Sequence, residues 1–308
     1  MIRSRSGRPS ISVVVVAYDM ARELPRTLRS LAPDYQRGIA ADDYEVVVVD
    51  NGSPAPIDPA LLAAFPGRLR AARIDPAPPS PAHAANVGAE MADGELVGLL
   101  IDGARIASPG LLGRALLARR LAERPLVASL AWHLGPALHA HAETSGYDRA
   151  AEDRLLADLD WERDGYRLFE TATLAESSSR GWFAPMGESN GVFMLADTWE
   201  GLGGLDERFA LPGGGLANHD FFRRACEADG TRLIVLLGEG TFHQIHGGAA
   251  TSGRFGWQEM HDEYVALRGR PYRPPENERL YLGTVPASVL PHVEHAAQRA
   301  MQLRENTK

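Results

Sequence analysis

The sequence predicts an α/β fold built on a mostly parallel central sheet flanked by helices. Residues 13–16 and 46–49 are valine runs, apolar on both faces, as expected for strands buried inside a parallel sheet. Strand and helix patterns then alternate at short spacing, which is typical of βαβ units. Asp19 and Asp50 follow the two valine runs, at the strand ends where open α/β sheets bind ligands. The segment 50–53, DNGS, also suits a plain turn.

Local patterns define the elements of the first half of the chain. Strands are predicted at 11–17, 44–49, 69–74, 95–101 and 125–131. Helices are predicted at 20–31, 58–65, 82–92 and 109–123. Four prolines mark a rigid loop before the third of these helices: Pro76, Pro78, Pro79 and Pro81.

The second half has a less regular pattern. Residues 132–189 mix histidines, acids and aromatics without a clean period, and we expect a partly helical excursion there. That excursion either shapes a binding pocket or is an insertion without a chemical role. Strands are predicted at 191–196 and 232–237, with Asp197 capping a short helix after the first of them.

The end of the chain is predicted to be helical. One helix carries Trp257, Met260, Tyr264 and Leu267, and a last amphipathic helix begins near Pro291. The apolar side of the last helix is expected to pack on the body of the protein, on a second subunit or on a membrane surface. Its members are Val293, Ala296, Ala297, Ala300 and Met301.

Composition excludes several classes of function. The chain has 308 residues, of which 44% are hydrophobic, and a formal net charge of −8. A nucleic-acid partner is not expected, because phosphate binding needs clustered Lys and Arg. No apolar run approaches the roughly 20 residues that span a bilayer, and no secretory signal is evident. The single cysteine, Cys226, excludes an intramolecular disulfide, and we expect a cytoplasmic protein.

Four motifs follow one another in the first half: DNGS at 50–53, N-x-G at Asn86 and Gly88, A-x-G at 92–94, and Asp102 after a predicted strand. These motifs resemble those of the family 2 glycosyltransferases with a GT-A fold. In that family a strand ending in a polar residue is followed by a strand ending D-N-G-S, by N-x-G with a downstream A-x-G, and by a strand carrying D-x-D.

The second half resembles the same family. The segment 203–209, GGLDERF, is similar to its G-G-F-D-E segment, and 218–225, NHDFFRRA, is similar to its acidic helix motif. The segment 243–248, HQIHGG, is similar to its late histidine motif, so that the resemblance covers residues 11–248. It implies a GT-A domain at 10–250, with a nucleotide-binding half at 10–131, an acceptor half at 132–250 and a helical extension at 251–308.

The resemblance implies a nucleotide-diphospho-sugar donor, and we expect a UDP-sugar, with GDP-sugars and dTDP-sugars left open. Asp50 is expected to accept a hydrogen bond from the base, while Asn86 and Gly88 are expected near the ribose and diphosphate. Gly88 also permits close approach of its helix, and Asn86 alternatively serves as a helix cap. The implied donor-binding residues are Ala17, Tyr18, Asp19, Asp50, Asn86, Gly88, Asp102 and Gly103.

The D-x-D motif departs from the family pattern, because Ala104 stands where the second aspartate is usual. The family motif binds Mg²⁺ or Mn²⁺, and such hard ions need several oxygen ligands. Three explanations stay open: Asp102, His246 and the diphosphate hold the metal, Arg105 or another cation replaces it, or transfer activity is lost. His243 lies three residues before His246, and on an extended segment the two would face opposite sides.

The acceptor is expected to be a carbohydrate or another hydroxyl compound. Asp220 matches the aspartate that acts as general base in inverting members, although His219 stands where glutamate is common. Asp220 equally suits the first turn of a helix, where a carboxylate stabilises the macrodipole. The glycines of 211–216, LPGGGL, suit a flexible rim that closes over substrate.

Other functions fit the sequence less well. A non-catalytic protein that binds sugar nucleotides or carbohydrates on the same fold is the main alternative, and Ala104 favours it. A sugar nucleotidyltransferase would show a Gly-rich basic loop after the first strand, and a Rossmann dehydrogenase would show G-x-G-x-x-G. Neither pattern is present. A homodimer contact through 251–308 is also expected to be available.

Overall fold

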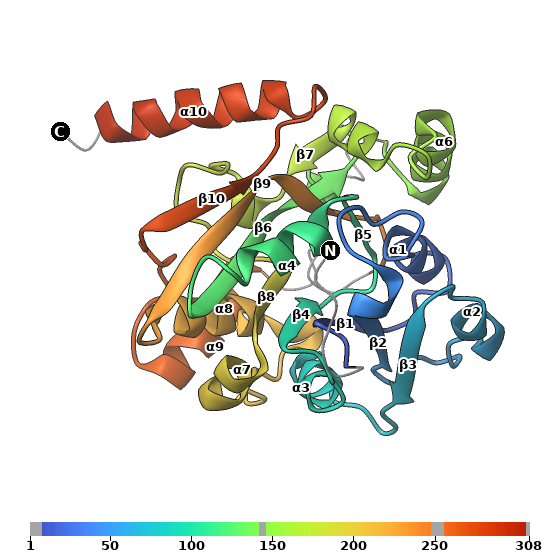
Figure 1. Ribbon diagram of the computed structural model, residues 1–308. Coiled ribbons are helices and arrows are strands. Elements are labelled where there is room, and N and C mark those ends of the chain that lie inside the picture. Colours follow the sequence, from blue (N-terminus) through green and yellow to red (C-terminus); the bar gives the residue numbers. More distant parts are fainter. Residues whose placement is uncertain (1–7, 142–145, 248–255, 306–308) are drawn as a thin grey trace.

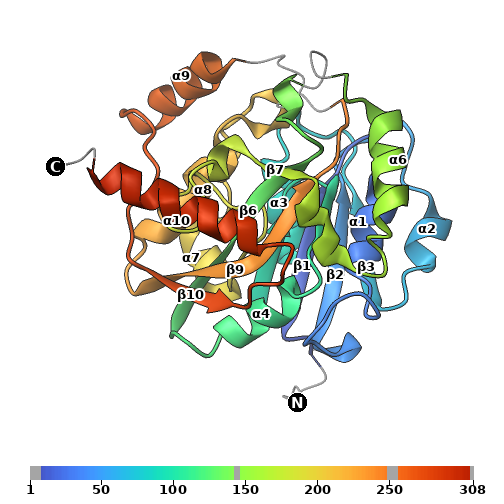
Figure 2. The same ribbon diagram turned by 90° about the horizontal axis from the view of Figure 1, so that it is seen from above.

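The computed structural model describes residues 8–141, 146–247 and 256–305. Within these ranges one 10-stranded sheet forms the centre of the molecule, and helices cover both of its faces (Figures 1 and 2). The main path of the sheet has the order β10-β9-β6-β8-β4-β1-β2-β3, and β5 and β7 pair outside this path with β9 and β6. The predicted fold class is confirmed.

The first half forms the parallel part of the sheet. β1 lies between β2 and β4, and β2 pairs with β3, all in parallel. The predicted strands and helices are present here, although all four helices are shorter than predicted. The strands are β1 (Ile11–Ala17), β2 (Tyr44–Asp50), β3 (Arg68–Arg73) and β4 (Leu96–Leu100), and the helices are α1 (Leu24–Ser30), α2 (Pro59–Ala63), α3 (Ala82–Glu90) and α4 (Leu111–Ala118).

Two long strands build the second half of the sheet. β6 (Arg124–Leu134) and β9 (Thr231–His243) run parallel to each other, with a register shift between Ala128 and Leu130. β8 (Val192–Leu195) is antiparallel to both β4 and β6. Because β8 reverses direction between them, β4 and β6 point the same way, and so does β9. The carboxyl ends of β1, β4, β6 and β9 therefore lie at one edge of the sheet.

Three short strands were not predicted from the sequence. β5 (Arg105–Ala107) pairs antiparallel with β9, and β7 (Ala172–Leu174) pairs antiparallel with β6. β10 (Arg279–Gly283) extends the sheet in parallel beyond β9, so the C-terminal extension is not purely helical. Segments of three to five residues carry too little periodicity to be recognised without their partners.

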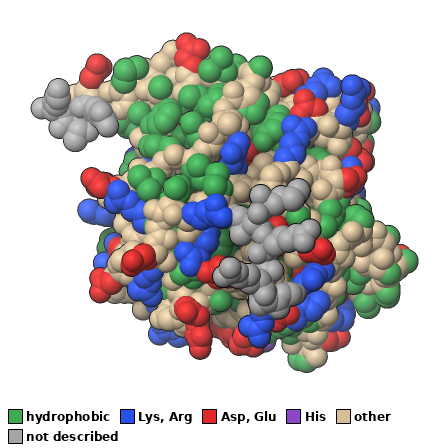
Figure 3. Space-filling view, viewed as in Figure 1, with side chains coloured by type: hydrophobic (Ala, Val, Ile, Leu, Met, Phe, Trp, Pro, Cys, Tyr) green, Lys and Arg blue, Asp and Glu red, His purple; other side chains and the backbone are tan. Residues whose placement is uncertain are grey.

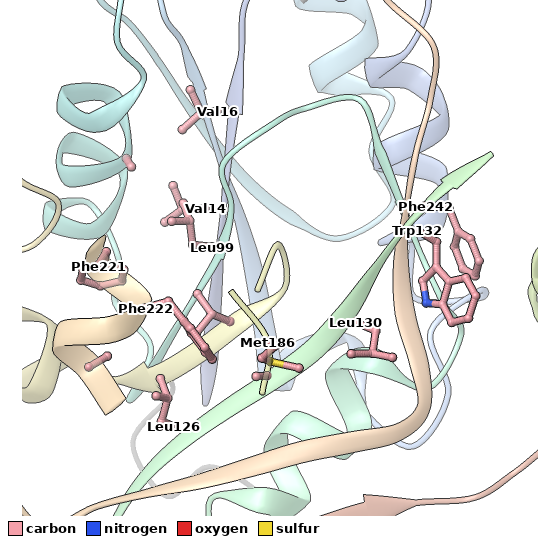
Figure 4. Close-up of a cluster of buried hydrophobic side chains, with 14 of the residues drawn as sticks. Val14, Val16, Leu99, Leu126, Leu130, Trp132, Met186, Phe221, Phe222 and Phe242 are labelled. Atoms are coloured by element: carbon pink, nitrogen blue, oxygen red, sulfur yellow. The ribbon is translucent and has the colours of Figure 1, made fainter. Parts of the chain in front are cut away.

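Alternate side chains of the central strands enter two separate cores. Val14 and Val16 belong to the core beneath α3, whereas Val13 and Val15 belong to the core beneath α1 and α4. Figure 4 shows part of the first core, including side chains of β1, β6 and β9 and of the helix α8 (Ala217–Glu227). A Cβ atom at Gly88 would lie 2.3 Å from Val14 Cγ1, so the close approach expected for this glycine is present.

The excursion after β6 contains ordered helices. α6 (Arg149–Leu159) is capped by Asp148, whose side chain accepts a hydrogen bond from the backbone N–H of Ala151.

α7 (Ala196–Leu202) follows β8 directly. Asp197 lies inside its first turn and makes no capping hydrogen bond, so the predicted cap is wrong; Leu195 occupies the capping position.

The last helix packs on the body of the same chain. α9 (Trp257–Arg268) precedes β10, and α10 (Leu290–Glu305) follows it along the outside of the molecule (Figure 1). In α10, Ala296 is fully buried, whereas Met301 is 59% exposed. Hydrophobic side chains gather over this upper part of the molecule in Figure 3. The predicted packing on the chain itself is therefore present for Ala296 and absent for Met301.

Among the residues that the structure describes, no helix combines the length and apolar character needed to cross a bilayer.

Candidate functional site

A cavity of about 1040 Å³ lies at the edge of the sheet where the carboxyl ends of the parallel strands meet. Asp19 after β1 and Asp102 after β4 line it, together with His133 of β6 and His243 at the end of β9. Residues from the C-terminal extension close another side, among them Trp257 of α9. This is the position at which open α/β sheets bind ligands.

Three ionisable side chains converge in this cavity. Asp102 Oδ2 lies 2.6 Å from His243 Nε2 and 3.4 Å from His246 Nε2. The two Nε2 atoms lie 3.0 Å apart. The expectation that His243 and His246 face opposite sides is wrong: β9 ends at His243, and beyond this strand the two rings meet on the same side. Gly247 also lines the cavity, whereas Gly248 lies outside the described residues.

The hydrogen bond between His139 and His243 determines which ring nitrogen of His243 carries the proton. His139 Nε2 lies 3.0 Å from the carbonyl oxygen of Leu134 and therefore carries the proton of a neutral ring. Its Nδ1 then accepts a hydrogen bond from His243 Nδ1–H, at 3.2 Å. Burial lowers the pKa of His243 to about 3 and that of His139 to about 4. In the neutral form of His243, Nε2 is therefore left without a proton and points at the carboxylate.

This arrangement needs a positive centre between the three groups. Burial opposes charge on Asp102, but His243 and His246 outweigh it and hold the pKa of the carboxyl well below its usual range. Burial likewise opposes the charge on His246, yet Asp102 raises its pKa. In the protein alone the His246 proton can fill this position. A divalent cation that binds there would displace that proton.

The structure offers two histidine clusters, and only one of them suits a metal. Ligand atoms converge in Asp102, His243 and His246 and also in His133, His139 and His243. In the second cluster, His133 Nδ1 accepts a hydrogen bond from the backbone N–H of His139, at 3.0 Å. His139 Nδ1 is occupied by His243, so these lone pairs are not free.

The first cluster presents one carboxylate oxygen and two imidazole nitrogens. Ala104 adds no side-chain ligand, but its backbone N–H donates to Asp102 Oδ1 at 3.0 Å, which leaves Oδ2 facing the histidines. Imidazole is a poor ligand for Mg²⁺ and a better one for transition metals. Of the two ions expected, the donor set therefore suits Mn²⁺ better than Mg²⁺.

A second carboxylate in the cavity, that of Glu188, is held by three side chains. Asn218 Nδ2 donates to Glu188 Oε2 at 2.6 Å, and Asn190 Nδ2 donates to Oε1 at 3.1 Å. His219 Nδ1 lies 3.4 Å from Oε2. Burial opposes the charge of Glu188, but His219 and Asn218 outweigh it and hold the pKa of this carboxyl below its ordinary value. Glu188 is therefore an oriented, ionised hydrogen-bond acceptor.

Sequence reasoning did not single out Glu188. It lies in an irregular segment, GESNG, and its partners on α8 are about 30 residues away along the chain. Its neighbour His219 is the residue noted for departing from the family pattern.

The residues predicted after β1 lie at the cavity. Tyr18 and Asp19 line it, and Tyr18 is 53% exposed. Asp19 has a φ of 53°, and its backbone N–H donates to Ser53 Oγ, which joins the ends of β1 and β2. Ala17 is buried beneath this surface. Gly103 packs closely against β1, since a Cβ atom there would lie 3.0 Å from the carbonyl oxygen of Val16, and it does not line the cavity.

Asp50 lies next to the cavity but does not line it. Its Oδ1 accepts the backbone N–H of Ser53 at 2.8 Å, and its Oδ2 accepts Arg73 Nη1 at 2.7 Å. Burial opposes its charge, but Ser53 and Arg73 outweigh it and lower the pKa of Asp50. The turn interpretation thus accounts for both of its oxygens, while Asn51 and Gly52 line the cavity instead.

Asn86 does not line this cavity. Its Nδ2 donates to the carbonyl oxygen of Leu205 and to Glu207 Oε1, both at 2.9 Å, and its Oδ1 accepts the backbone N–H of Leu205. The side chain therefore joins α3 to the GGLDE segment, and it is not a helix cap. Gly88 is packed against β1 beneath the same helix.

Asp220 also lies outside the cavity that contains Asp102. It is 1% exposed and accepts hydrogen bonds from Arg224 Nε at 2.8 Å and from Arg268 Nε and Nη2 at 2.5 and 2.7 Å. These groups line a different cavity, of about 640 Å³, together with Asn86. The structure thus pairs Asp220 with two arginines and does not bring it together with Asp102 or His246.

Comparison with known families gives one match. Residues 12–116 match the family model described as Glycosyl transferase family 2. This segment runs from β1 into α4 and includes Asp19 and Asp102. No curated protein sequence matches the chain significantly.

Solved structures share the fold at low sequence identity. The crystal structure of S. aureus TarS 1-349 has a TM-score of 0.54 and 14% identity, and the match covers 76% of this chain and 60% of that chain. TarS 1-349 in complex with UDP-GlcNAc has the same TM-score and identity, with coverages of 83% and 66%. This chain thus spans less than two thirds of the length of these structures, and the likeness shows a common fold.

Proposed function

We propose that this chain transfers a sugar from a nucleoside-diphospho-sugar to an acceptor hydroxyl; the match of residues 12–116 to the glycosyl transferase family 2 model and the GT-A fold support this activity. The observation that carries the proposal is the convergence of Asp102, His243 and His246 in a cavity of about 1040 Å³ at the carboxyl edge of the sheet. A cavity of that size accommodates a nucleoside-diphospho-sugar and part of an acceptor.

A UDP-sugar is the donor that we expect. The structurally similar TarS forms a complex with UDP-GlcNAc, which supports this choice for a chain of the same fold. The base would lie against the loops after β1 and β2, where Tyr18, Asp19 and Asn51 line the cavity. Asp50 would act by fixing this edge, through Ser53 and Arg73, rather than by direct contact alone.

Asp102, His243 and His246 would hold Mn²⁺. When bound, the ion supplies positive charge that stabilises the diphosphate leaving group. His139 would keep His243 in the tautomer that presents Nε2 to the ion, because the partner of the second ring nitrogen fixes a ligating imidazole. These three ligands would compensate for the second aspartate of the D-x-D motif, which Ala104 replaces.

Glu188 would act as the general base of an inverting transfer. The acceptor oxygen forms a bond to the anomeric carbon while the bond from that carbon to the diphosphate oxygen breaks, and the acceptor proton passes to Glu188. Asn218, Asn190 and His219 orient its carboxylate at the cavity wall. We prefer Glu188 to Asp220 for this role, because Asp220 is occupied by Arg224 and Arg268 outside this cavity.

A panel of nucleoside diphosphates tests the donor site. The melting temperature would be measured with UDP, GDP, dTDP, CDP and ADP, each with Mn²⁺ and with EDTA. We expect stabilisation by UDP that is larger with Mn²⁺, because a ligand bound only to the folded state raises its stability. Stabilisation by another nucleoside diphosphate would show that the donor carries a different nucleobase. No stabilisation by any of them would refute the proposal.

A binding protein without transfer activity is the second candidate, and Ala104 favours it. The two functions differ in turnover. Hydrolysis of the sugar nucleotide that is lost in Glu188→Gln would identify an enzyme, whereas binding without any hydrolysis or transfer would favour the binding protein.

A further inference from the structure

Arg105, a buried cation in the cavity, has no hydrogen-bond or ion-pair partner among the residues that the structure describes. Arg105 is 8% exposed and lines the cavity, and its Nε and Nη1 atoms make no hydrogen bond. No ion pair within 4.0 Å involves its guanidinium among the described residues. A buried charge without a partner is costly, because desolvation is not repaid by a hydrogen-bonded counter-ion. Partly buried arginines elsewhere in the fold are paired: Arg224 and Arg268, for example, both form ion pairs with Asp220.

The strand β5 fixes Arg105 beside the metal ligands. Arg105 pairs across the antiparallel ladder with His243, and paired residues on neighbouring strands project on the same face of a sheet. Asp102 lies three residues earlier, just after β4, which ends at Leu100. The two carboxylates closest to the proposed chemistry, Asp102 and Glu188, act on Arg105 through space and partly oppose the lowering of its pKa by burial.

We propose that Arg105 binds the diphosphate of the donor and supplies positive charge to it in addition to that of the proposed Mn²⁺. This inference rests on the proposed function and names the group in that site that meets the leaving diphosphate. A guanidinium suits this role, since its planar array of N–H donors matches phosphate oxygens. Its unpaired N–H groups would gain partners only when the donor is bound, so the cost of burying them would be repaid by the ligand.

Binding measurements on three variants test the role of Arg105. Arg105→Met removes the charge at similar length, and Arg105→Lys keeps the charge without the planar donor array. Arg154→Gln is the matched control, because Arg154 is an exposed arginine that does not line the cavity. Dissociation constants would be measured by calorimetry for UDP, uridine and inorganic pyrophosphate, with Mn²⁺ and with EDTA.

We expect Arg105→Met to weaken UDP and pyrophosphate binding by about 10- to 100-fold and to leave uridine binding unchanged, as for the loss of hydrogen bonds to a charged group. Arg105→Lys should fall between Arg105→Met and the natural protein, and Arg154→Gln should change UDP binding by less than about threefold. Without ligand, Arg105→Met should melt at the same temperature as the natural protein or higher. A clearly lower melting temperature would show that the guanidinium stabilises the fold and would contradict the inference.

The outcomes separate this inference from the proposed function. If the natural protein binds UDP and Arg105→Met binds it equally well, Arg105 does not contact the diphosphate, while the donor site stands. If the protein binds none of the nucleoside diphosphates but binds pyrophosphate through Arg105, the anion site stands and the donor proposal is wrong. If neither UDP nor pyrophosphate binds, both are overturned.

Discussion

The choice between the two histidine clusters predicts which substitution abolishes metal binding. His246→Ala removes one of the three ligands that face one another around Asp102. His133→Asn removes an imidazole from the other cluster but keeps an acceptor near the position of Nδ1 for the backbone N–H of His139. We therefore expect Mn²⁺ binding to be lost in His246→Ala and retained in His133→Asn.

The size of the effect follows from linkage. An Mn²⁺ concentration one hundred times the dissociation constant stabilises the folded state by about 2.7 kcal/mol. For a chain of 308 residues, an unfolding entropy of about 2.1 cal/mol/K per residue gives roughly 0.65 kcal/mol/K, so the melting temperature rises by about 4 °C. If His246→Ala weakens binding one hundredfold, the remaining stabilisation is about 0.4 kcal/mol and the shift falls to about 0.6 °C.

Thermal unfolding with and without Mn²⁺ is a suitable assay, and calorimetric titration gives the dissociation constant directly. Each variant is compared with its own metal-free melting temperature, so a loss of stability caused by the substitution itself does not enter the result. A full shift in His246→Ala together with no shift in His133→Asn would move the metal to the other cluster. Full shifts in both variants would place the metal outside the histidine clusters and refute the reasoning.

Three further predictions concern single residues. Glu188→Gln should abolish transfer while UDP affinity stays within about threefold, because the amide cannot accept the proton; turnover near normal by coupled assay would remove Glu188 as the base. Asp220→Asn should lower the free energy of unfolding by about 3 kcal/mol, since Arg224 and Arg268 lose a buried counter-ion, and should leave UDP affinity unchanged; denaturant unfolding and calorimetry measure both, and a stable variant without transfer activity would restore Asp220 as the base. Cys226 is 3% exposed and burial raises its pKa to about 12, so it should react with a thiol reagent at pH 8 only after unfolding; rapid labelling of the native protein would contradict its burial.

Much of the fold follows from local pattern. The valine runs of β1 and β2 are apolar on both faces because both faces are covered, and this reads directly from the sequence. The short strands β5 and β10 could not be recognised, because each is stabilised by pairing with β9 rather than by its own periodicity. The direction of β8 was equally inaccessible, since a four-residue strand carries no signal for its orientation.

The site was predicted only in part. Asp102 and His246 could be placed together from motif order, and the structure brings them to 3.4 Å. His243 was expected to face away because extended geometry was assumed to continue past it, whereas β9 ends at that residue. Glu188 and Asn218 come together only through the packing of α8 against the segment before β8, a contact that spacing along the chain does not encode.

Asp220 shows that a motif residue can have a structural role in the fold. An aspartate in the first turn of a helix four residues before an arginine has a structural use, and here Arg224 and Arg268 occupy it. Asn86 is similar, since its amide joins two segments through three hydrogen bonds. In both cases the residue type and position suit chemistry, and the polar atoms are already paired within the fold.

Anomalous diffraction from crystals grown with Mn²⁺ and UDP tests most directly where the metal and the diphosphate bind. We expect an anomalous peak for Mn²⁺ at roughly 2.0–2.3 Å from Asp102 Oδ2, His243 Nε2 and His246 Nε2. The diphosphate of UDP should lie between this ion and Arg105. A peak at another site, or UDP bound outside the cavity lined by Asp102 and Glu188, would contradict the account.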